Sequence, residues 1–328
     1  MKNEIIQDYS KTIVAEMYLR ILQEHLYIWQ ADQCIRNIVR NHCQKNSDDW
    51  RKILDVGCGP GRLTSSLGSR KDYRIGIDLS ADFIEYACEI SRAVHPHDLD
   101  PNLDFKVVDF ATNQNIKLGV TDVDLQECDV IVMQGVMHHI HDKDRTRFLQ
   151  RSFDLLKPDG ILIIGDEFIK EYDTEEKRVF NVAKFYLHII DEARKGDFDE
   201  LAEEEAKNLI DDCFSGTENA GLATEKTFEH IYQYAAVINK MFYEYGAIAG
   251  LNFEADNQIR SMFNYIKRSV EHLIGSSSEN FNRGDLKVSI QRFINELADY
   301  GFSVRGFVKK IGPVDELGGM AVIVFEKA

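Results

Sequence analysis

The sequence contains no apolar run that approaches the roughly 20 residues a helix needs to cross a bilayer. Its start also differs from a signal peptide, because Glu4 and Asp8 stand on either side of a very short apolar pair, Ile5 and Ile6. We therefore expect a cytoplasmic protein with no membrane partner.

Paired cysteines and an excess of basic residues are also missing. The six cysteines are scattered, and no two form a Cys-x-x-Cys pair, which disfavours a disulfide framework or a zinc ribbon. The net charge of −16 gives a surface that repels phosphate backbones, so no nucleic-acid partner is expected. The sequence is 44% hydrophobic and 29% charged, which is enough for an ordinary globular core.

Short runs of β-branched residues alternate with helical stretches from residue 51 onward. This alternation predicts an α/β fold whose mostly parallel sheet is covered on both faces. The predicted strands are 52–56, 73–78, 104–108, 128–133 and 161–165. The predicted helices between them are 81–94 and 143–156, and the second is followed by a turn at Lys157-Pro158-Asp159-Gly160.

Three segments are expected along the chain. Residues 1–50 form an N-terminal helical segment, in which apolar residues recur every three or four positions. Residues 51–169 and 285–328 form the α/β domain, which closes with a helix near 286–300 and strands near 302–308 and 319–326. Residues 170–284 show no strand pattern and read as a large all-helical insertion after the fifth strand.

A glycine turn follows the first predicted strand. Its spacing, Gly57-x-Gly59-x-Gly61, is one residue tighter than the dinucleotide fingerprint G-x-G-x-x-G. Glycines let the backbone approach a ligand closely, and a helix starting after such a turn offers free N–H groups. A glycine turn alone is weak evidence for any particular ligand.

Acidic residues stand at the ends of the first three strands. Asp55 precedes the glycine turn, Asp78 ends the second strand and Asp109 follows the third. A carboxylate in the position of Asp78 can accept hydrogen bonds from a ribose diol, and one in the position of Asp109 can reach the exocyclic amine of an adenine. Together with the glycine turn, these acids predict an adenosine-containing ligand.

At these positions the sequence resembles the class I, Rossmann-like S-adenosylmethionine-dependent methyltransferases, especially the small-molecule branch that includes ubiquinone-biosynthesis-type enzymes. The resembling stretches are 53–61, 76–80, 108–110, 134–140 and 155–160. The resemblance implies a seven-stranded Rossmann-like sheet whose last strand is antiparallel and lies beside the sixth. It also implies S-adenosylmethionine as the cofactor and S-adenosylhomocysteine as the product.

The resemblance also assigns roles to single residues. It implies that Asp55, Gly57, Gly59 and Gly61 approach the methionine part and that Asp78 holds the ribose hydroxyls. It implies that Asp109 holds the adenine amine, Phe110 contributes its backbone N–H, and the backbone at Gln134 lies near the methionine amino group. Leu79 is a further candidate cofactor contact, although Leu79 and Phe110 could equally be packing residues.

Candidate catalytic residues follow the fourth and fifth strands. Methyl transfer from a sulfonium depends mainly on alignment, and a general base is needed only for an acceptor that is protonated at neutral pH. His138 or His139 could be that base, and Glu167 could be a base or a substrate contact; His141 and Asp166 lie beside them. A buried, hydrogen-bonded histidine and a solvent-exposed glutamate are the alternatives. No metal is expected, because the sulfonium donor needs none.

The resulting hypothesis is an enzyme that methylates O, N or C of a partly apolar or aromatic small molecule, enclosed by the helical insertion acting as a lid. A nicotinamide-dependent oxidoreductase is disfavoured by the glycine spacing and Asp109. A non-catalytic S-adenosylmethionine-binding relative and a methyltransferase acting on tRNA or protein remain open, and a homodimer is an open expectation.

Overall fold

The computed structural model describes residues 27–44, 50–94, 100–112, 117–118, 123–124, 127–174, 177–178, 181–182, 184–185, 188 and 286–328. The first 26 residues of the expected N-terminal helical segment and most of the insertion expected at 170–284 lie outside these residues. The described residues between 177 and 188 are helical, as the pattern in that stretch predicts.

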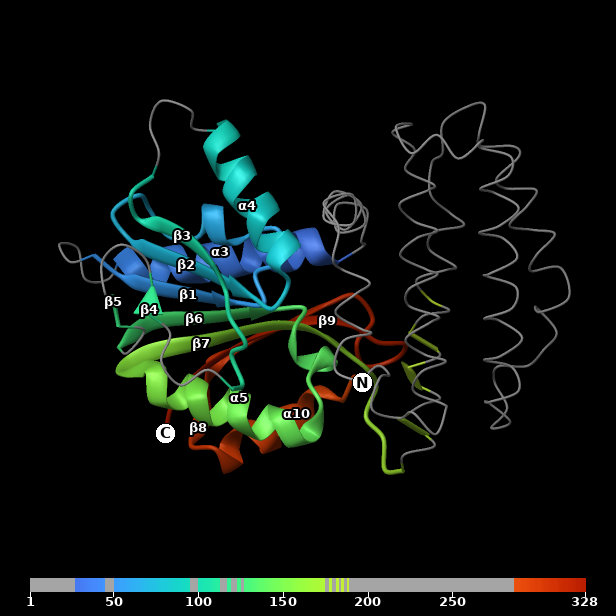
Figure 1. Ribbon diagram of the computed structural model, residues 1–328. Helices are drawn as coiled ribbons and strands as arrows, with labels where there is room; N and C mark the ends of the chain where they lie inside the picture. Colours follow the sequence, from blue (N-terminus) through green and yellow to red (C-terminus); the bar gives the residue numbers. More distant parts are fainter. Residues whose placement is uncertain are drawn as a thin grey trace, which may run out of the picture.

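A seven-stranded sheet forms the centre of the protein, with the strand order β3-β2-β1-β6-β7-β9-β8 (Figure 1). The first five strands in this order run parallel, and β9 is antiparallel to both of its neighbours. The strands are β1 (Lys52–Val56), β2 (Tyr73–Asp78), β3 (Leu103–Val107), β6 (Cys128–Gln134), β7 (Leu156–Phe168), β8 (Phe302–Ile311) and β9 (Gly319–Lys327). The predicted Rossmann-like architecture with an antiparallel last strand is thereby confirmed.

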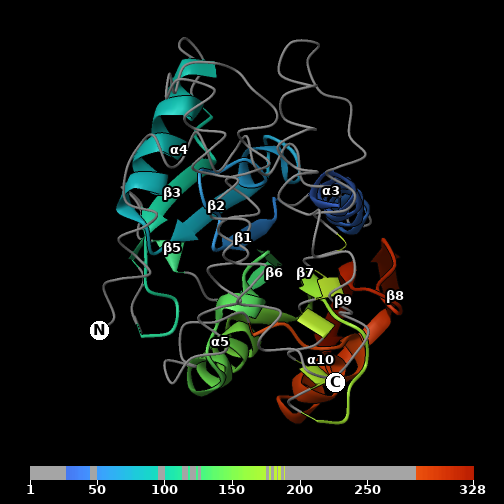
Figure 2. The ribbon, with the colours of Figure 1, turned by 90° about the vertical axis from the view of Figure 1, so that its right-hand side faces the viewer.

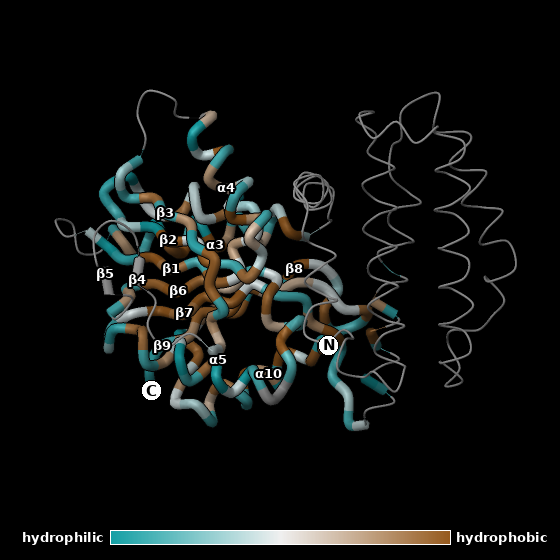
Figure 3. The backbone as a smooth tube through the Cα atoms, in the orientation of Figure 1, coloured by the Kyte–Doolittle hydropathy of each residue, from teal (hydrophilic) through white to brown (hydrophobic). Residues whose placement is uncertain are grey.

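Helices cover both faces of this sheet (Figures 1 and 2). They are α3 (Ile28–Gln44), α4 (Ala81–Val94), α5 (Asp142–Leu155) and α10 (Ile290–Asp299). The helices α5 and α10 bury Phe148 and Phe293 against one face, whereas α3 packs Ile35 and Val39 on the other. The central strands are consequently apolar on both sides, which Figure 3 shows as a brown centre. In the parts of the chain that the structure describes, no helix is long and apolar enough to cross a membrane.

Two local features differ from the expectations. The residues predicted as a turn at 157–160 belong to β7, where the pairing with β6 jumps from Cys128–Leu156 to Val130–Ile161. The turn-forming residues are therefore accommodated as a bulge at the start of a longer strand. A small antiparallel ribbon, formed by β4 (Lys117–Leu118) and β5 (Val123–Asp124), was not predicted, because two-residue strands leave no periodic signal.

The order of the strands determines where a ligand can bind. The connections from β1 lead to β2 and β3 on one side, and those from β6 lead to β7 on the other. The strand order therefore reverses between β1 and β6, and in such sheets ligands bind outside the carboxyl ends of the strands at this point. The glycine turn after β1 and the histidines after β6 both lie there.

Candidate functional site

The glycine turn is held against the end of β2 by backbone hydrogen bonds. The N–H groups of Gly57 and Cys58 donate to the Ile77 carbonyl at 2.8 and 3.0 Å. Gly57, Gly59 and Gly61 have φ angles of 70°, 53° and 78°, a conformation that favours glycine. A Cβ on Gly61 would lie 2.6 Å from Cε1 of Phe105, so this position also lacks room for a side chain.

The helix expected directly after the glycine turn is not formed. Only the single 3₁₀ turn η1 (Thr64–Ser66) follows, and Leu67 leaves it in an extended conformation. Gly68 then takes a φ of 59° and Asp72 accepts hydrogen bonds from Ser69, which turns the chain back toward β2. The chain therefore turns back toward β2 before a longer helix forms.

Asp55 is the buried acid beneath the turn. Its side chain is 2% exposed, and Oδ2 accepts a hydrogen bond from Thr64 Oγ1 at 2.6 Å. Burial raises the pKa of Asp55 to about 7; the Thr64 hydrogen bond opposes this shift and the nearby Asp78 adds to it. Asp55 therefore sits where a positively charged group would be favoured.

Asp78 and Asp109 lie at neighbouring strand ends. Asp78 accepts hydrogen bonds from the N–H groups of Gly59 and Ser80, both at 2.9 Å, and Val108 N–H donates to the Asp78 carbonyl at 2.8 Å. Burial raises the pKa of Asp78, and these backbone donors oppose the rise. Asp109 accepts from the N–H of Ala111 at 3.0 Å, which fixes its carboxylate in the turn after β3.

The other predicted cofactor contacts differ in their surroundings. The Leu79 side chain is 48% exposed next to Asp78. The Phe110 side chain is 2% exposed and packs edge-on against Phe148 at 5.1 Å between ring centroids, so this ring is a core residue. Only the backbone of Phe110 is then left for a ligand. Gln134 ends β6, and its buried side-chain amide has no hydrogen-bond partner among the described residues.

An ion pair that sequence reasoning missed ties the N-terminal helix to the glycine turn. Asp32 of α3 is fully buried, and Arg62, the residue after the turn, donates to its Oδ1 at 3.2 Å. Arg36, one helical turn further along α3, approaches the same carboxylate at 3.7 Å. The pair is invisible in the sequence because its two members lie on different elements.

A cluster of charged residues lies at the carboxyl ends of β6 and β7. His138 is in the 3₁₀ turn η2 (Met137–His139) after β6, and its Nδ1 is hydrogen-bonded to Asp166 Oδ1. Asp166 also accepts from the N–H groups of Met137 and Glu167, both at 2.7 Å. His138 Nε2 lies 3.8 Å from Glu167 Oε2, and the His138 and His139 rings are in contact, with centroids 3.8 Å apart and planes tilted by 47°. The structure therefore brings all three predicted catalytic residues together.

Lys287 completes this cluster and was not predicted. Its side chain is 1% exposed, and Nζ lies 2.8 Å from Glu167 Oε2. The backbone around it returns to the sheet edge, because Leu286 N–H donates to the His138 carbonyl at 3.0 Å and Ile169 N–H to the Val288 carbonyl at 3.1 Å. Glu167 is thus buried and ion-paired, and not exposed at the strand end.

The protonation of His138 reflects opposing influences. Burial disfavours the charged imidazolium, but Asp166, through its charge and its hydrogen bond, and Glu167 outweigh both burial and the opposing charge of Lys287. The pKa of His138 is therefore raised above its ordinary value. Across the described residues, no group of three or more His, Cys, Asp or Glu side chains is arranged to hold a metal ion.

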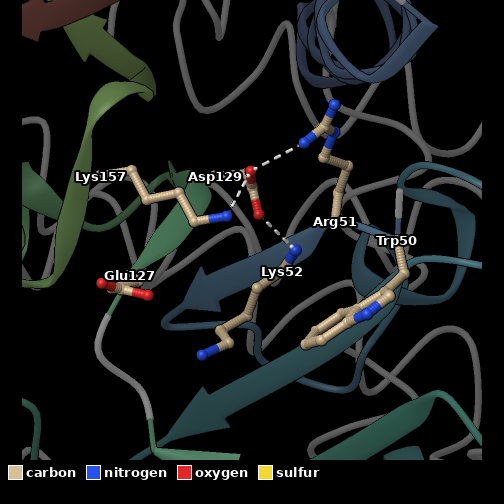
Figure 4. A pocket seen from close by; sticks show the side chains of 6 residues that line it. All are labelled: Trp50, Arg51, Lys52, Glu127, Asp129 and Lys157. Carbon is tan, nitrogen blue, oxygen red and sulfur yellow. Dashed lines mark hydrogen bonds and ion pairs between the residues drawn. The ribbon is translucent and has the colours of Figure 1, made fainter. Parts of the chain in front are cut away.

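A hollow of about 260 Å³ lies at the opposite, amino-terminal edge of the sheet, next to the starts of β1 and β6 (Figure 4). Asp129 is its centre: it accepts hydrogen bonds from Lys52 N–H at 2.8 Å, Lys157 Nζ at 2.9 Å and Arg51 Nη1 at 3.3 Å. These hydrogen bonds neutralise the Asp129 carboxylate and join β1 to β6, so we assign the hollow a structural role.

Comparison with known proteins finds a methyltransferase domain in this chain. Residues 53–160 match a family model described as "Methyltransferase domain". The chain is 38% identical to the mitochondrial ubiquinone biosynthesis O-methyltransferase of Bos taurus over 113 residues. These residues cover 34% of this chain and 28% of that protein. The malonyl-[acyl-carrier protein] O-methyltransferase of Halalkalibacterium halodurans is 29% identical over 59% of this chain and 66% of its own length.

Residues 53–160 therefore form a methyltransferase domain of the class I, S-adenosylmethionine-dependent type. The predicted family and its cofactor are thereby confirmed. The chain spans less than two thirds of the length of these curated relatives. A crystal structure of magnesium protoporphyrin IX methyltransferase from Synechocystis PCC 6803 with bound SAH aligns over 100% of both chains, at 12% identity and a TM-score of 0.49.

The residues at this edge of the sheet fit S-adenosylmethionine. The glycine turn presents backbone without side chains, and the buried carboxylate of Asp55 favours the positive charge of an ammonium or sulfonium group. Asp78 already accepts two N–H groups, and its oxygens retain lone pairs for ribose hydroxyls. The side-chain amide of Gln134, which has no hydrogen-bond partner within the described part of the chain, offers a donor and an acceptor at the end of β6.

Proposed function

We propose that this chain transfers a methyl group from S-adenosylmethionine to a hydroxyl oxygen of a small, partly apolar acceptor. The observation that carries the proposal is the buried His138–Asp166 pair at the carboxyl edge of the sheet, next to the predicted cofactor site. A histidine held in this way is a proton acceptor, and a hydroxyl is the acceptor group that needs one. Both curated relatives described above are named as O-methyltransferases.

In this proposal, Asp55, Gly57, Gly59 and Gly61 hold the methionine part of the cofactor. The other predicted contacts, Asp78, Leu79, Asp109, Gln134 and the backbone of Phe110, hold its ribose, adenine and amino group. When bound, S-adenosylmethionine supplies a methyl group on a sulfonium. These residues therefore fix the methyl group against the acceptor, and such alignment supplies much of the rate.

His138 then removes the proton that a hydroxyl must lose. Its Nδ1 is engaged by Asp166, so the proton goes to Nε2 while the oxygen forms the new bond to the methyl carbon. His139, whose tilted ring lies against that of His138, supports its position. Glu167 acts through its charge near Nε2 rather than as the first base, because Lys287 holds its carboxylate.

The helical insertion at 170–284 is proposed as the lid that encloses the acceptor and excludes water. Its two ends meet beside the catalytic cluster, through the hydrogen bond from Ile169 to Val288. Replacing 170–284 by a short linker should leave S-adenosylhomocysteine binding intact and abolish acceptor turnover. Unchanged turnover in a folded deletion variant would remove the lid from the proposal. A cytoplasmic location and a homodimer remain predictions.

The test of the reaction combines binding and turnover. S-adenosylhomocysteine should bind in calorimetry, and S-adenosylmethionine should be consumed with a panel of catechols and alkylphenols, with methyl ethers detected by mass spectrometry. His138→Gln should lower kcat/KM by about 10²- to 10⁴-fold without changing cofactor affinity, whereas the matched variant His139→Gln should lower it less. Turnover of carboxylic acids that survives His138→Gln would contradict the hydroxyl acceptor.

A further inference from the structure

We infer that Lys287 and Asp166 are positioning residues, which leave Nε2 of His138 able to take up the acceptor proton. The inference rests on the methyl transfer proposed above and deepens it, because it assigns the residues that prepare the base. Neither residue needs to touch the cofactor or the acceptor. Each acts through a neighbouring side chain that the structure places beside it.

Asp166 determines which ring nitrogen of His138 is available. Its carboxylate binds Nδ1 through Oδ1, and it is itself held by the backbone N–H groups of Met137, His138 and Glu167. A carboxylate can only accept, so the neutral imidazole carries its proton on Nδ1. Nε2 is then the nitrogen with a free lone pair, and it cannot rotate away without breaking the bond to Asp166.

Lys287 keeps Glu167 from occupying that nitrogen. Glu167 Oε2 lies 3.8 Å from Nε2, which is too long for a hydrogen bond, and 2.8 Å from Lys287 Nζ. Without the ammonium group, the same carboxylate could close on Nε2 and hold it as an imidazolium. Lys287 therefore keeps the Glu167 carboxylate away from Nε2 of His138, which the carboxylate would otherwise hold in its protonated form.

The charged and titratable groups around His138 come from five parts of the chain. Asp166 and Glu167 face it from β7, Lys287 from the segment before α10, and His139 from η2 itself. From α5, Arg145 donates to the carbonyls of Met137 and Ile140 on either side of His138, and it is paired with Glu296 of α10 at 3.2 Å. Of these groups, the two carboxylates of β7 raise the pKa of His138 and Lys287 lowers it.

The experiment is a titration of the His138 ring by NMR, on the full chain labelled with ¹³C-histidine and saturated with S-adenosylhomocysteine. Lys287→Met should move the His138 midpoint upward by about one pH unit, since it removes a like charge from the site. Glu167→Gln and Asp166→Asn should each move it downward by a similar amount. Lys287→Arg should stay close to the wild type, and so should the exposed control Lys309→Met.

A double variant protects the test against misfolding. Lys287→Met removes the ammonium group that Glu167 binds, whereas Glu167→Gln/Lys287→Met removes both charges. The His138 midpoint of the double variant should fall between those of the two single variants. Midpoints that move in the same direction in both single variants, or that move no more than in Lys309→Met, would overturn the inference. A merely structural role would not produce opposite shifts that cancel.

Calorimetry with S-adenosylhomocysteine and the methylation assay on the same proteins separate this inference from the proposed function. Methyl transfer with unmoved midpoints would keep the proposed function and remove the roles of Lys287 and Asp166. Opposite shifts of the His138 midpoint in a protein that binds S-adenosylhomocysteine but methylates no hydroxyl acceptor would support the charge interactions around His138. The same result would contradict the proposed methylation of a hydroxyl group.

Discussion

Replacing Asp55 by asparagine should make the cofactor-free protein less sensitive to pH. Asp55 is 2% exposed and its carboxylate receives the Thr64 hydroxyl at 2.6 Å. The side-chain oxygen of asparagine can accept the same hydrogen bond and occupies nearly the same volume. The substitution therefore removes a buried charge while it leaves the packing under the glycine turn unchanged.

The magnitude follows from the pKa of Asp55, which burial raises from 3.8 to about 7. Because the folded pKa lies above the unfolded one, the folded state binds more protons between pH 4 and pH 7, and stability falls as the pH rises through that window. A tenfold difference in proton affinity between the folded and unfolded states corresponds to about 1.4 kcal/mol, so the ionised carboxylate costs the fold about 4 kcal/mol above pH 7. Asp55→Asn should be free of this cost.

Urea denaturation followed by circular dichroism at pH 5, 6, 7 and 8 provides the measurement. The difference in the free energy of unfolding between Asp55→Asn and the wild type should grow by about 3 kcal/mol from pH 5 to pH 8. The exposed variant Asp159→Asn serves as the matched control and should show no such trend. A difference for Asp55→Asn that stays within about 0.5 kcal/mol across this range would refute the assignment of a desolvated carboxylate.

Two further substitutions test the cofactor site. Gly61→Ala should lower stability by about 1–3 kcal/mol and weaken S-adenosylhomocysteine binding, because its Cβ would meet Phe105 at 2.6 Å. Gly306→Ala is the control, because Gly306 has a similar φ of 63° but lies in open space. Equal losses for the two variants in thermal and calorimetric measurements would contradict the steric argument. Asp78→Ala should weaken S-adenosylhomocysteine binding by about 1–3 kcal/mol through lost hydrogen bonds, and unchanged calorimetric affinity would contradict the ribose placement.

The sheet could be predicted well because its strands carry their own signal. β1, β2, β6 and β7 are buried on both faces, so each appears in the sequence as a short β-branched run. The antiparallel position of β9 was available only from the resemblance to a family, since no local pattern specifies which edge a strand joins. The glycine turn and the acids at the ends of β2 and β3 were also predictable, because each directly follows or ends a strand that the sequence itself indicates.

The sequence did not predict features that depend on contacts between distant segments or on the local backbone conformation. Lys287 pairs with Glu167 although the whole expected insertion separates them in sequence, and Arg62 pairs with Asp32 across a helix and a loop. The missing helix after the glycine turn has a local cause, because Leu67 leaves the 3₁₀ turn in an extended conformation and Gly68 follows with a φ of 59°. Sequence spacing contains no information on such long-range pairs.

The hydrogen bond between Ile169 and Val288 has a consequence for how a protein with this sheet can change during evolution. Ile169 and Val288, which flank the predicted insertion, are immediate neighbours, at 3.1 Å between N and O. The entropic cost of closing a loop between fixed neighbours grows only slowly with its length, by about 0.6 kcal/mol for each doubling. Segments of very different size and sequence can therefore be exchanged at this junction, which makes it a natural place to acquire a new acceptor without rebuilding the cofactor site.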